Sequence, residues 1–196
     1  MPCPEKFRET LVEYGVAGEI IAEIDCGYEK IVSKSPKKAK AQFFKHALSV
    51  MESKLSLEKI RTIFEANACC KSGARLKASK EFARINAGLP LEDKLAKIAH
   101  APYMNMGKPA LDENGDIIVD AVHYQVGERF TCACPAISKQ AIQPDSKNYC
   151  YCCAGHFKFH YEIMLNCKLS VAEIISSPLD SNGANSCMIK LRIDNQ

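Results

Sequence analysis

The spacing of apolar side chains predicts that the first half of the chain is helical. Apolar residues between positions 11 and 24 recur close to every 3.6 residues, so we expect one helix from about Pro4 to a stop at Gly27. Comparable patterns predict four more helices, over residues 36–54, 57–68, 74–87 and 90–100. Pro36 suits a first helical position, and Ser35 suits the N-cap before it.

The pattern changes near Ala101-Pro102, after which short apolar runs alternate with turn signals. Asn114-Gly115 is a strong hairpin dipeptide, and Ile117-Ile118-Val119 after it predicts a strand. Gly107-Lys108-Pro109 indicates another turn, and residues 136–149 are expected to form an irregular loop.

The remaining elements are one helix and two strands. A helix is expected over residues 155–166, a strand over 171–176 and a turn over 178–185. In the last strand, residues 188–193, apolar residues alternate with Lys190 and Arg192, so one face should be buried and the other should face water.

These elements predict an α+β fold. We expect a helical part, residues 1–101, packed as one unit on a cysteine-rich part, residues 102–196, which holds a small antiparallel sheet and one helix.

Composition and charge argue against two classes of partner. The 196 residues are 47% hydrophobic and 25% charged with a formal charge of +3, which is ordinary for a globular protein. The densest basic run, Lys37-Lys38-Ala39-Lys40, lacks interleaved aromatic residues and is interpreted as a solvated helix face rather than a nucleic-acid site. No apolar stretch approaches the length of a membrane span, and no apolar core of a signal peptide follows Met1-Pro2-Cys3-Pro4.

The chain has eleven cysteines, an odd number, and shows no export signal. A chain of this length can form a core without disulfides. We therefore expect a reduced, cytoplasmic protein that uses cysteine for metal binding or for thiol chemistry.

The strongest candidate for chemistry is the segment from Cys132 to His160. It contains the thiols of Cys132, Cys134, Cys150, Cys152 and Cys153 and the imidazoles of His156 and His160. Thiolate sulfur and imidazole nitrogen are ligands that zinc prefers. We expect Cys132, Cys134, Cys150 and one of Cys152 or Cys153 to bind zinc, with His156 as a substitute ligand.

Three alternatives to zinc remain open at this stage. The one-residue spacings differ from the two-residue spacing of common zinc ribbons, and they fit the common iron–sulfur motifs less well still. A reactive thiol without metal is a further alternative, and so is a core of reduced, buried cysteines. On the helix face that carries His156 and His160, Cys167 is another candidate ligand.

A second cysteine motif, Cys69-Cys70-Lys71-Ser72-Gly73-Ala74-Arg75, lies between two predicted helices. Free N–H groups at a helix start, together with Lys71 and Arg75, could bind a carboxylate or phosphate. We expect a pocket between the two parts of the chain, lined by Cys70, Arg75 and His160. Cys69 is expected to be a small buried side chain at a helix corner.

Familiar catalytic signatures do not occur in the chain. It has no Gly-x-Ser-x-Gly elbow, no P-loop and no dinucleotide-binding fingerprint. The sequence therefore leaves open whether the protein is an enzyme.

One succession of elements resembles a known domain. It comprises a cysteine-rich segment, a helix, a strand, and a glycine-containing turn before a final strand that opens with cysteine. Here these parts are Cys150-Tyr151-Cys152-Cys153-Ala154-Gly155-His156, His160-Tyr161-Glu162, residues 171–176 and Gly183-Ala184-Asn185-Ser186-Cys187. With them, the stretch from about Phe130 to Ile193 resembles the 4-vinyl reductase (hydrocarbon-binding) domain. The resemblance implies an α+β ligand-binding fold, often dimeric, that holds small hydrophobic molecules and sometimes metal.

Two weaker likenesses add no activity. Phe64-Glu65-Ala66-Asn67-Ala68-Cys69-Cys70, with Gly107-Lys108-Pro109 and the later cysteine clusters, resembles an uncharacterised group of bacterial cysteine-rich proteins. The cysteine-rich helical context is also loosely similar to the aminothiazoline-carboxylate hydrolase group. No catalytic residue carries over from any of these.

The sequence thus predicts a zinc-containing protein that binds or senses a small molecule, with a homodimer as one possible assembly. The alternative is a thiol- or metal-dependent enzyme, either a hydrolase or a redox protein. Four protein ligands on the zinc would indicate a structural role, and three ligands plus water would indicate catalysis.

Overall fold

The computed structural model describes residues 3–101 and 105–194, so the expected boundary at Ala101-Pro102 lies partly outside the described residues. The fold is α+β, as predicted. Helices of the described part, in chain order, are α1 (Pro4–Glu13), α2 (Gly18–Asp25), α3 (Lys37–Lys54), α4 (Leu57–Ala66), α5 (Gly73–Ile85), α6 (Leu91–Ala99), the short 3-10 helix η2 (Lys147–Cys150) and α7 (Tyr151–Leu165). The strands are β1 (Lys108–Leu111), β2 (Ile117–Val122), β3 (Gln125–Val126), β4 (Arg129–Phe130), β5 (Leu169–Ser176) and β6 (Cys187–Ile193).

The prediction of one continuous first helix is wrong, because α1 and α2 are separate. Gly15 adopts a left-handed backbone with φ of +62°, which ends the first helix after Glu13. Val16 remains 6% exposed, and Leu11 and Ile24 are fully buried in the same core. The apolar period therefore continues across the break and conceals it in the sequence.

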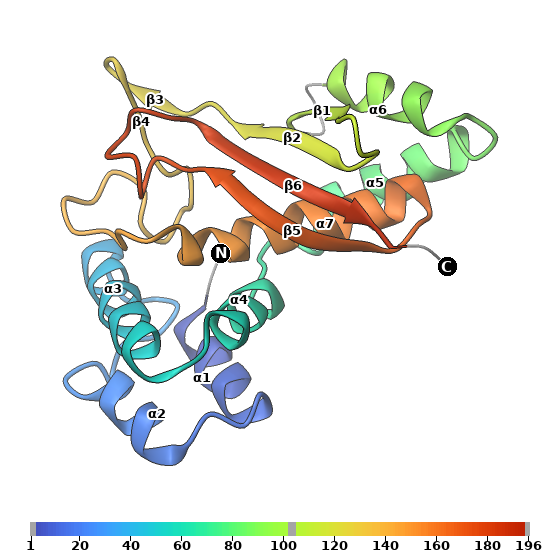
Figure 1. The fold of residues 1–196 in the computed structure, drawn as a ribbon. Coiled ribbons are helices and arrows are strands. Elements are labelled where there is room, and N and C mark those ends of the chain that lie inside the picture. Colours follow the sequence, from blue (N-terminus) through green and yellow to red (C-terminus); the bar gives the residue numbers. More distant parts are fainter. Residues whose placement is uncertain (1–2, 102–104, 195–196) are drawn as a thin grey trace.

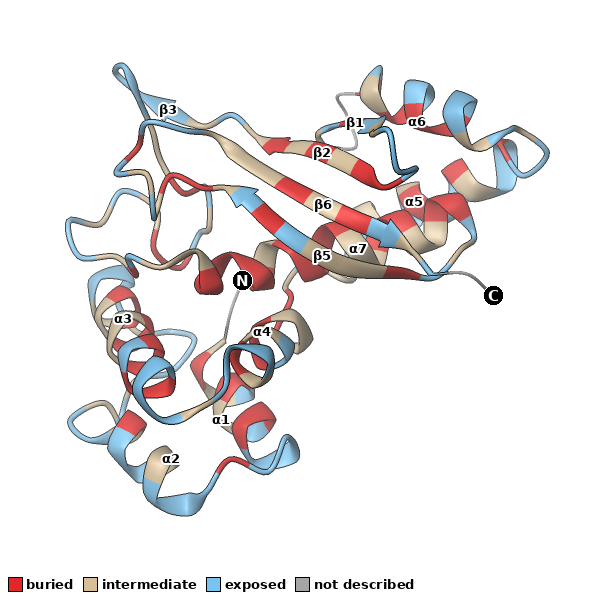
Figure 2. Cartoon of the chain, in the orientation of Figure 1, coloured by how far each residue is buried: buried red, intermediate tan, exposed pale blue. Residues whose placement is uncertain are grey.

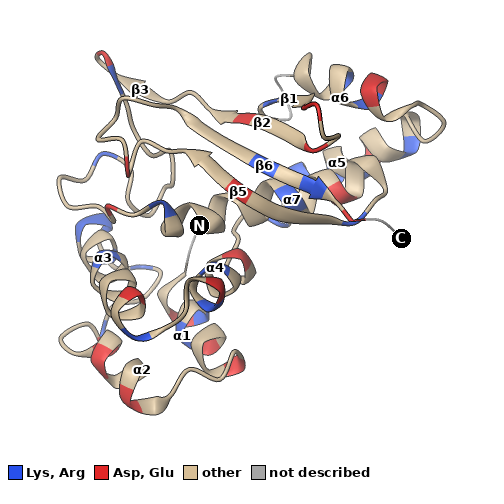
Figure 3. Ribbon diagram, in the orientation of Figure 1, with Lys and Arg blue, Asp and Glu red and all other residues tan. Residues whose placement is uncertain are grey.

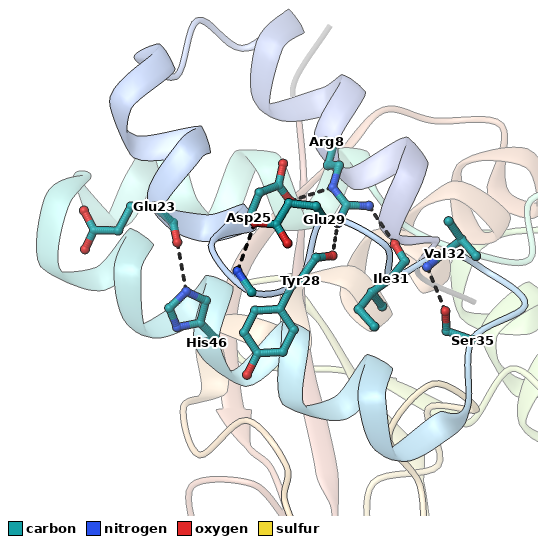
Figure 4. A network of polar contacts seen from close by, with 10 residues as sticks. Arg8, Glu23, Asp25, Tyr28, Glu29, Ile31, Val32, Ser35 and His46 are labelled. Atoms are coloured by element: carbon teal, nitrogen blue, oxygen red, sulfur yellow. Dashed lines mark hydrogen bonds and ion pairs between the residues drawn. The ribbon is translucent and has the colours of Figure 1, made fainter.

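Arg8 links α1 to the end of α2 and to the segment between α2 and α3, as Figure 4 shows. Its guanidinium donates hydrogen bonds to Asp25 Oδ1 at 2.6 Å and to the carbonyls of Tyr28 and Ile31, both at 2.7 Å. The same group lies 4.9 Å from the centre of the Phe43 ring. All three nitrogens of this half-buried guanidinium thus donate hydrogen bonds within the chain, and an aromatic ring lies beside the group.

The start of α3 differs from the prediction by one residue. Pro36 is its N-cap rather than its first helical residue, and Ser35 Oγ instead accepts a hydrogen bond from the Val32 N–H. Within the basic run, Lys37 and Lys38 are exposed as expected. Lys40, however, is 4% exposed and donates to the Ser33 carbonyl at 2.9 Å, so this part of the prediction is wrong.

Aromatic rings fill the core between α1, α3 and α4. Phe7 packs edge-on against Phe44 with ring centres 5.5 Å apart, and Phe44 packs likewise on Tyr149 at 5.8 Å. Tyr149 comes from η2, so this core joins the helices to the cysteine-rich part. Figure 2 shows that each of α1, α3 and α4 carries buried residues.

The main sheet has the order β1-β2-β6-β5, and all its pairs are antiparallel. Helix α7 packs against β5 and runs along the sheet (Figure 1). The Asn114-Gly115 turn joins β1 to β2 as predicted. Pro109, expected in a turn, lies in β1 instead, which an edge strand tolerates because its outer N–H positions need no partner.

The alternation in the last strand holds on its buried face. Ile189 is 2% exposed and Leu191 is fully buried. On the other face Arg192 is exposed, but Lys190 donates to Asp112 Oδ2 at 2.7 Å and is only partly open to water. The side chains of opposite charge are interspersed along the chain rather than segregated, as Figure 3 shows.

The position of α7 decides where the cysteines lie. The sequence placed its start at Gly155, but the helix begins at Tyr151, and Gly155 lies inside it. A Cβ on Gly155 would be 2.6 Å from the Glu65 carbonyl oxygen of α4. The absent side chain therefore lets α7 approach α4 and the loop after it. Of the described helices, none is long and apolar enough to cross a membrane.

Candidate functional site: a cavity lined by cysteines

A cavity of about 270 Å³ lies where β2, β5 and β6, the start of α7 and the loop between α4 and α5 meet. Figure 1 shows how far apart in the sequence these elements are. Eight of the eleven cysteines line it: Cys69, Cys70, Cys132, Cys134, Cys150, Cys152, Cys153 and Cys187. We call this space the cysteine cavity.

The rest of the wall of the cysteine cavity is mainly apolar. Val122, Phe157, Ile174 and Ile189 contribute hydrocarbon surface, while Arg75 and His156 are the basic residues. No Asp or Glu is found among the described lining residues. The site therefore offers soft sulfur donors rather than the carboxylate oxygens that magnesium and calcium need.

Burial keeps most of these thiols protonated. Loss of solvation raises the pKa of Cys150 to about 12 and that of Cys187 to about 11, and it also raises the pKa values of Cys132, Cys134 and Cys153. Cys150 Sγ donates to Ser177 Oγ at 3.2 Å, and Cys134 Sγ lies 3.5 Å from the Tyr149 hydroxyl. A metal that binds here would have to displace these protons.

Cys69 differs from the other thiols. A hydrogen bond from the Cys152 thiol lowers the pKa of Cys69, while the same contact and burial raise the pKa of Cys152. Cys152 Sγ also lies 3.4 Å from the Asn67 carbonyl. The two cysteines come from the loop before α5 and from the first turn of α7, so the contact exists only in the folded chain.

Both ring nitrogens of His156 are already engaged. Nδ1 donates to the Cys69 carbonyl at 2.9 Å, so Nε2 is the acceptor, and Arg75 Nη1 donates to it at 2.9 Å. Burial, with the nearby His160 and Arg75, lowers the pKa of His156 to about 3. The expected role of His156 as a substitute metal ligand would require one of these hydrogen bonds to break.

His160 stands behind the cavity wall rather than in it. Its Nε2 donates to the Cys70 carbonyl at 3.0 Å, and Ser79 Oγ donates to its Nδ1 at 2.8 Å. Burial lowers its pKa. Cys70 has a left-handed backbone with φ of 60°, which is unfavourable for a residue with a Cβ. His156 and His160 thus hold the Cys69-Cys70 backbone through its two carbonyls.

The structure brings most of the predicted site residues together. All six predicted metal ligands and two of the three predicted pocket residues, Cys70 and Arg75, line the cysteine cavity. His160 does not line it, although it contacts Cys70. Within the described residues, no group of three His, Cys, Asp or Glu side chains is arranged to hold a metal ion. The predicted zinc site therefore remains a prediction, with a suitable set of donors around one space.

Sequence reasoning missed two lining cysteines and misplaced a third. Cys69 had been interpreted as a buried corner residue, and Cys187 only as the start of a strand, yet both line the cavity. Cys167, expected on the histidine face, is not among the described residues that line it. The doublet Cys69-Cys70 before Gly73 was the one available signal, because a cysteine pair at a tight turn carries both thiols to the same region.

Comparisons of this chain with protein-family models, with curated proteins and with solved structures found no match. The resemblance to the 4-vinyl reductase domain therefore remains an expectation, and the function must be argued from the cavity.

Proposed function

We propose that this protein binds a thiophilic metal ion, with zinc as the first candidate, together with a small molecule in the cysteine cavity. The observation that carries the proposal is the convergence of eight thiols from four separate segments on one space. Cysteine is often buried as a small apolar residue, but random burial would scatter the thiols through the core.

Cys132, Cys134, Cys150 and Cys153 are the proposed metal ligands. The negative charges of these thiolates would act on one another: besides burial, Cys134 and Cys150 raise the pKa of Cys132, and Cys187, Cys150 and Cys134 raise that of Cys153. A bound divalent cation would offset this repulsion and supply the driving force for deprotonation. Of the neighbours Cys152 and Cys153, Cys152 is the weaker candidate ligand because its thiol already forms a hydrogen bond with Cys69.

The first experiment is elemental analysis of protein purified without chelator, followed by titration of metal-free protein with Co²⁺. Cobalt bound by thiolates absorbs strongly in the near ultraviolet, and the intensity reports the number of sulfur ligands. We expect zinc near one equivalent and a cobalt spectrum of three or four thiolates. A structural zinc site can contribute on the order of 10 kcal/mol of apparent binding free energy, so the metal-free protein should melt at a lower temperature.

Matched variants separate the cavity from the other thiols. Cys134→Ser and Cys150→Ser should lose metal and the cobalt spectrum, while Cys26→Ser, at an exposed position outside the cavity, should retain both. Protein that is free of metal, whose melting temperature zinc does not change, would contradict the metal half of the proposal.

A second candidate function is thiol chemistry without metal, and the contact between Cys69 and Cys152 favours it. A thiol with a lowered pKa is partly thiolate near neutral pH and therefore nucleophilic. In metal-free protein, iodoacetamide should modify Cys69 faster than Cys187, as read by mass spectrometry. Equal rates would remove the support for this candidate.

A further inference from the structure

Arg75 brings a positive charge into the wall of the cysteine cavity. Its Nη1 donates to His156 Nε2 at 2.9 Å, and that imidazole is neutral because Nε2 is an acceptor while Nδ1 carries the proton donated to the Cys69 carbonyl. None of the ion pairs between described residues involves Arg75. The guanidinium has five N–H donors in a planar fork, so the contact with His156 leaves donors for another group.

The surroundings make this cation unusual. Arg75 is half-buried, and burial of a charge beside apolar side chains is unfavourable to the extent that it removes water without supplying an opposite charge. The described lining contains no carboxylate to act as its partner, and Cys69, a lining thiol with a lowered pKa, already accepts a hydrogen bond from Cys152. Arg8, in the other core of the chain, is by contrast paired with Asp25 and two carbonyls.

The size of the cavity limits the occupant. An engineered apolar cavity of about 150 Å³ in another protein accommodates benzene, which has six heavy atoms. By proportion, the cavity of about 270 Å³ has room for a molecule of about ten heavy atoms. Phe157, Ile174 and Ile189 would contact its apolar body.

We infer that the small molecule bound in the cysteine cavity is an organic anion with an apolar body, whose acid group is held by Arg75. This inference rests on the small-molecule half of the proposed function and assigns its ligand to a chemical class. A carboxylate fits the planar fork of Arg75 with two parallel hydrogen bonds, and the apolar wall binds the remainder of the ligand. His156 accepts from Nη1, which leaves Nε and Nη2 of Arg75 to donate these two hydrogen bonds.

Phenylacetate and phenylacetamide provide a matched pair of probes, because each has ten heavy atoms and they differ in charge. Calorimetry with the protein as purified should show phenylacetate binding at least about tenfold more tightly than the neutral amide, as expected for a charge-assisted pair. Arg75→Met should abolish the difference, and Arg75→Lys should retain part of it. Lys77→Met removes an exposed cation from the same helix and should leave the difference unchanged.

Equal binding of the two probes, no binding of either, or a preference that survives in a folded Arg75→Met protein would overturn the inference. Thermal melting of each variant shows whether it is folded. If Arg75 instead balances the charge of a metal–thiolate centre, Arg75→Met will weaken cobalt binding and leave the probes indistinguishable. Metal binding is measured separately. If protein that does not bind zinc still prefers phenylacetate, the inferred ligand class is supported and the metal half of the proposed function is rejected.

Discussion

Two buried regions of this chain are constructed differently. Between α1, α3 and α4 the interior is filled by rings, with Phe44 fully buried and in contact with Phe7 and Tyr149. Between α7 and the sheet the interior leaves about 270 Å³ open, and thiols surround it. An arginine from each region can be compared: Arg8 donates hydrogen bonds to Asp25 and two carbonyls, whereas Arg75 donates to a neutral imidazole.

The contrast distinguishes a densely packed region from one that keeps open space within the same small protein. A region that serves only stability can fill its volume and pair its charges, since voids and unpaired charges both lower the free energy of unfolding. The cysteine cavity does neither, and it concentrates a reactive residue type. Such departures from good packing are expected where a site must receive a ligand.

The largest expected effect tests the filled region. Phe44→Ala should lower the free energy of unfolding by about 3–5 kcal/mol, because a fully buried ring is removed and a void remains. Ile174→Val removes one methyl group from the wall of the cysteine cavity and should cost about 0.5–1.5 kcal/mol, near the low end because the space beside it is already open. Urea denaturation measures both, and equal losses would erase the distinction between the regions.

The next largest expected loss of stability concerns strand β6 of the main sheet. Leu191→Ala should cost about 2–5 kcal/mol, because Leu191 is fully buried and pairs with Ile117 across the ladder. Lys190→Ala changes the adjacent residue on the other face and loses the ion pair with Asp112, so its shift in the denaturation midpoint should be clearly smaller. A larger shift for Lys190→Ala would mean that the buried face of β6 has been assigned incorrectly.

The two arginines allow a direct comparison of the regions. Arg8→Ala removes hydrogen bonds from a charged donor to three acceptors and should cost about 2–3 kcal/mol. Arg75→Ala should change the free energy of unfolding by less than about 1 kcal/mol, because it loses one hydrogen bond and relieves an unpaired charge. If the two variants unfold at the same urea concentration, Arg75 has a structural partner and the inferred ligand loses its support.

The most gradual effect concerns pH in metal-free protein. The pKa of His156 is lowered to about 3 in the folded state, so the unfolded chain binds a proton first as the pH falls. Stability from this group is complete above the unfolded pKa, near 6.5, and is lost as the pH falls toward 3, with a slope of up to about 1.4 kcal/mol per pH unit. His160 acts in the same direction.

Urea denaturation between pH 4 and pH 8 checks this slope. His156→Gln should flatten it, whereas His100→Gln, at an exposed position, should leave it unchanged. An unaltered slope in His156→Gln would show that the histidine is not held neutral against the cavity wall.

The sequence determined the elements that depend on neighbours along the chain. Periodicity located α3 to α6, alternation located the buried residues of β6, and Asn114-Gly115 located the hairpin turn, because each signal is read over a few residues. It failed where a local break left the period intact, as at Gly15, and at the first turn of α7, which lies before the predicted start at Gly155.

The lining of the cysteine cavity likewise includes residues that the sequence identified and residues that only the tertiary structure revealed. The cluster from Cys132 to Cys153 was visible because those residues are close in sequence. Only the tertiary structure could add Cys69 and Cys187, which reach the same space from the loop after α4 and from the start of β6. It also decided that His156 and His160 hold the Cys69-Cys70 backbone, because a hydrogen bond between residues more than eighty positions apart depends on how α7 packs against α4 and α5. The sequence determines which chemical groups are present, whereas the packing of distant segments determines the charge, exposure and hydrogen-bond partners of each group.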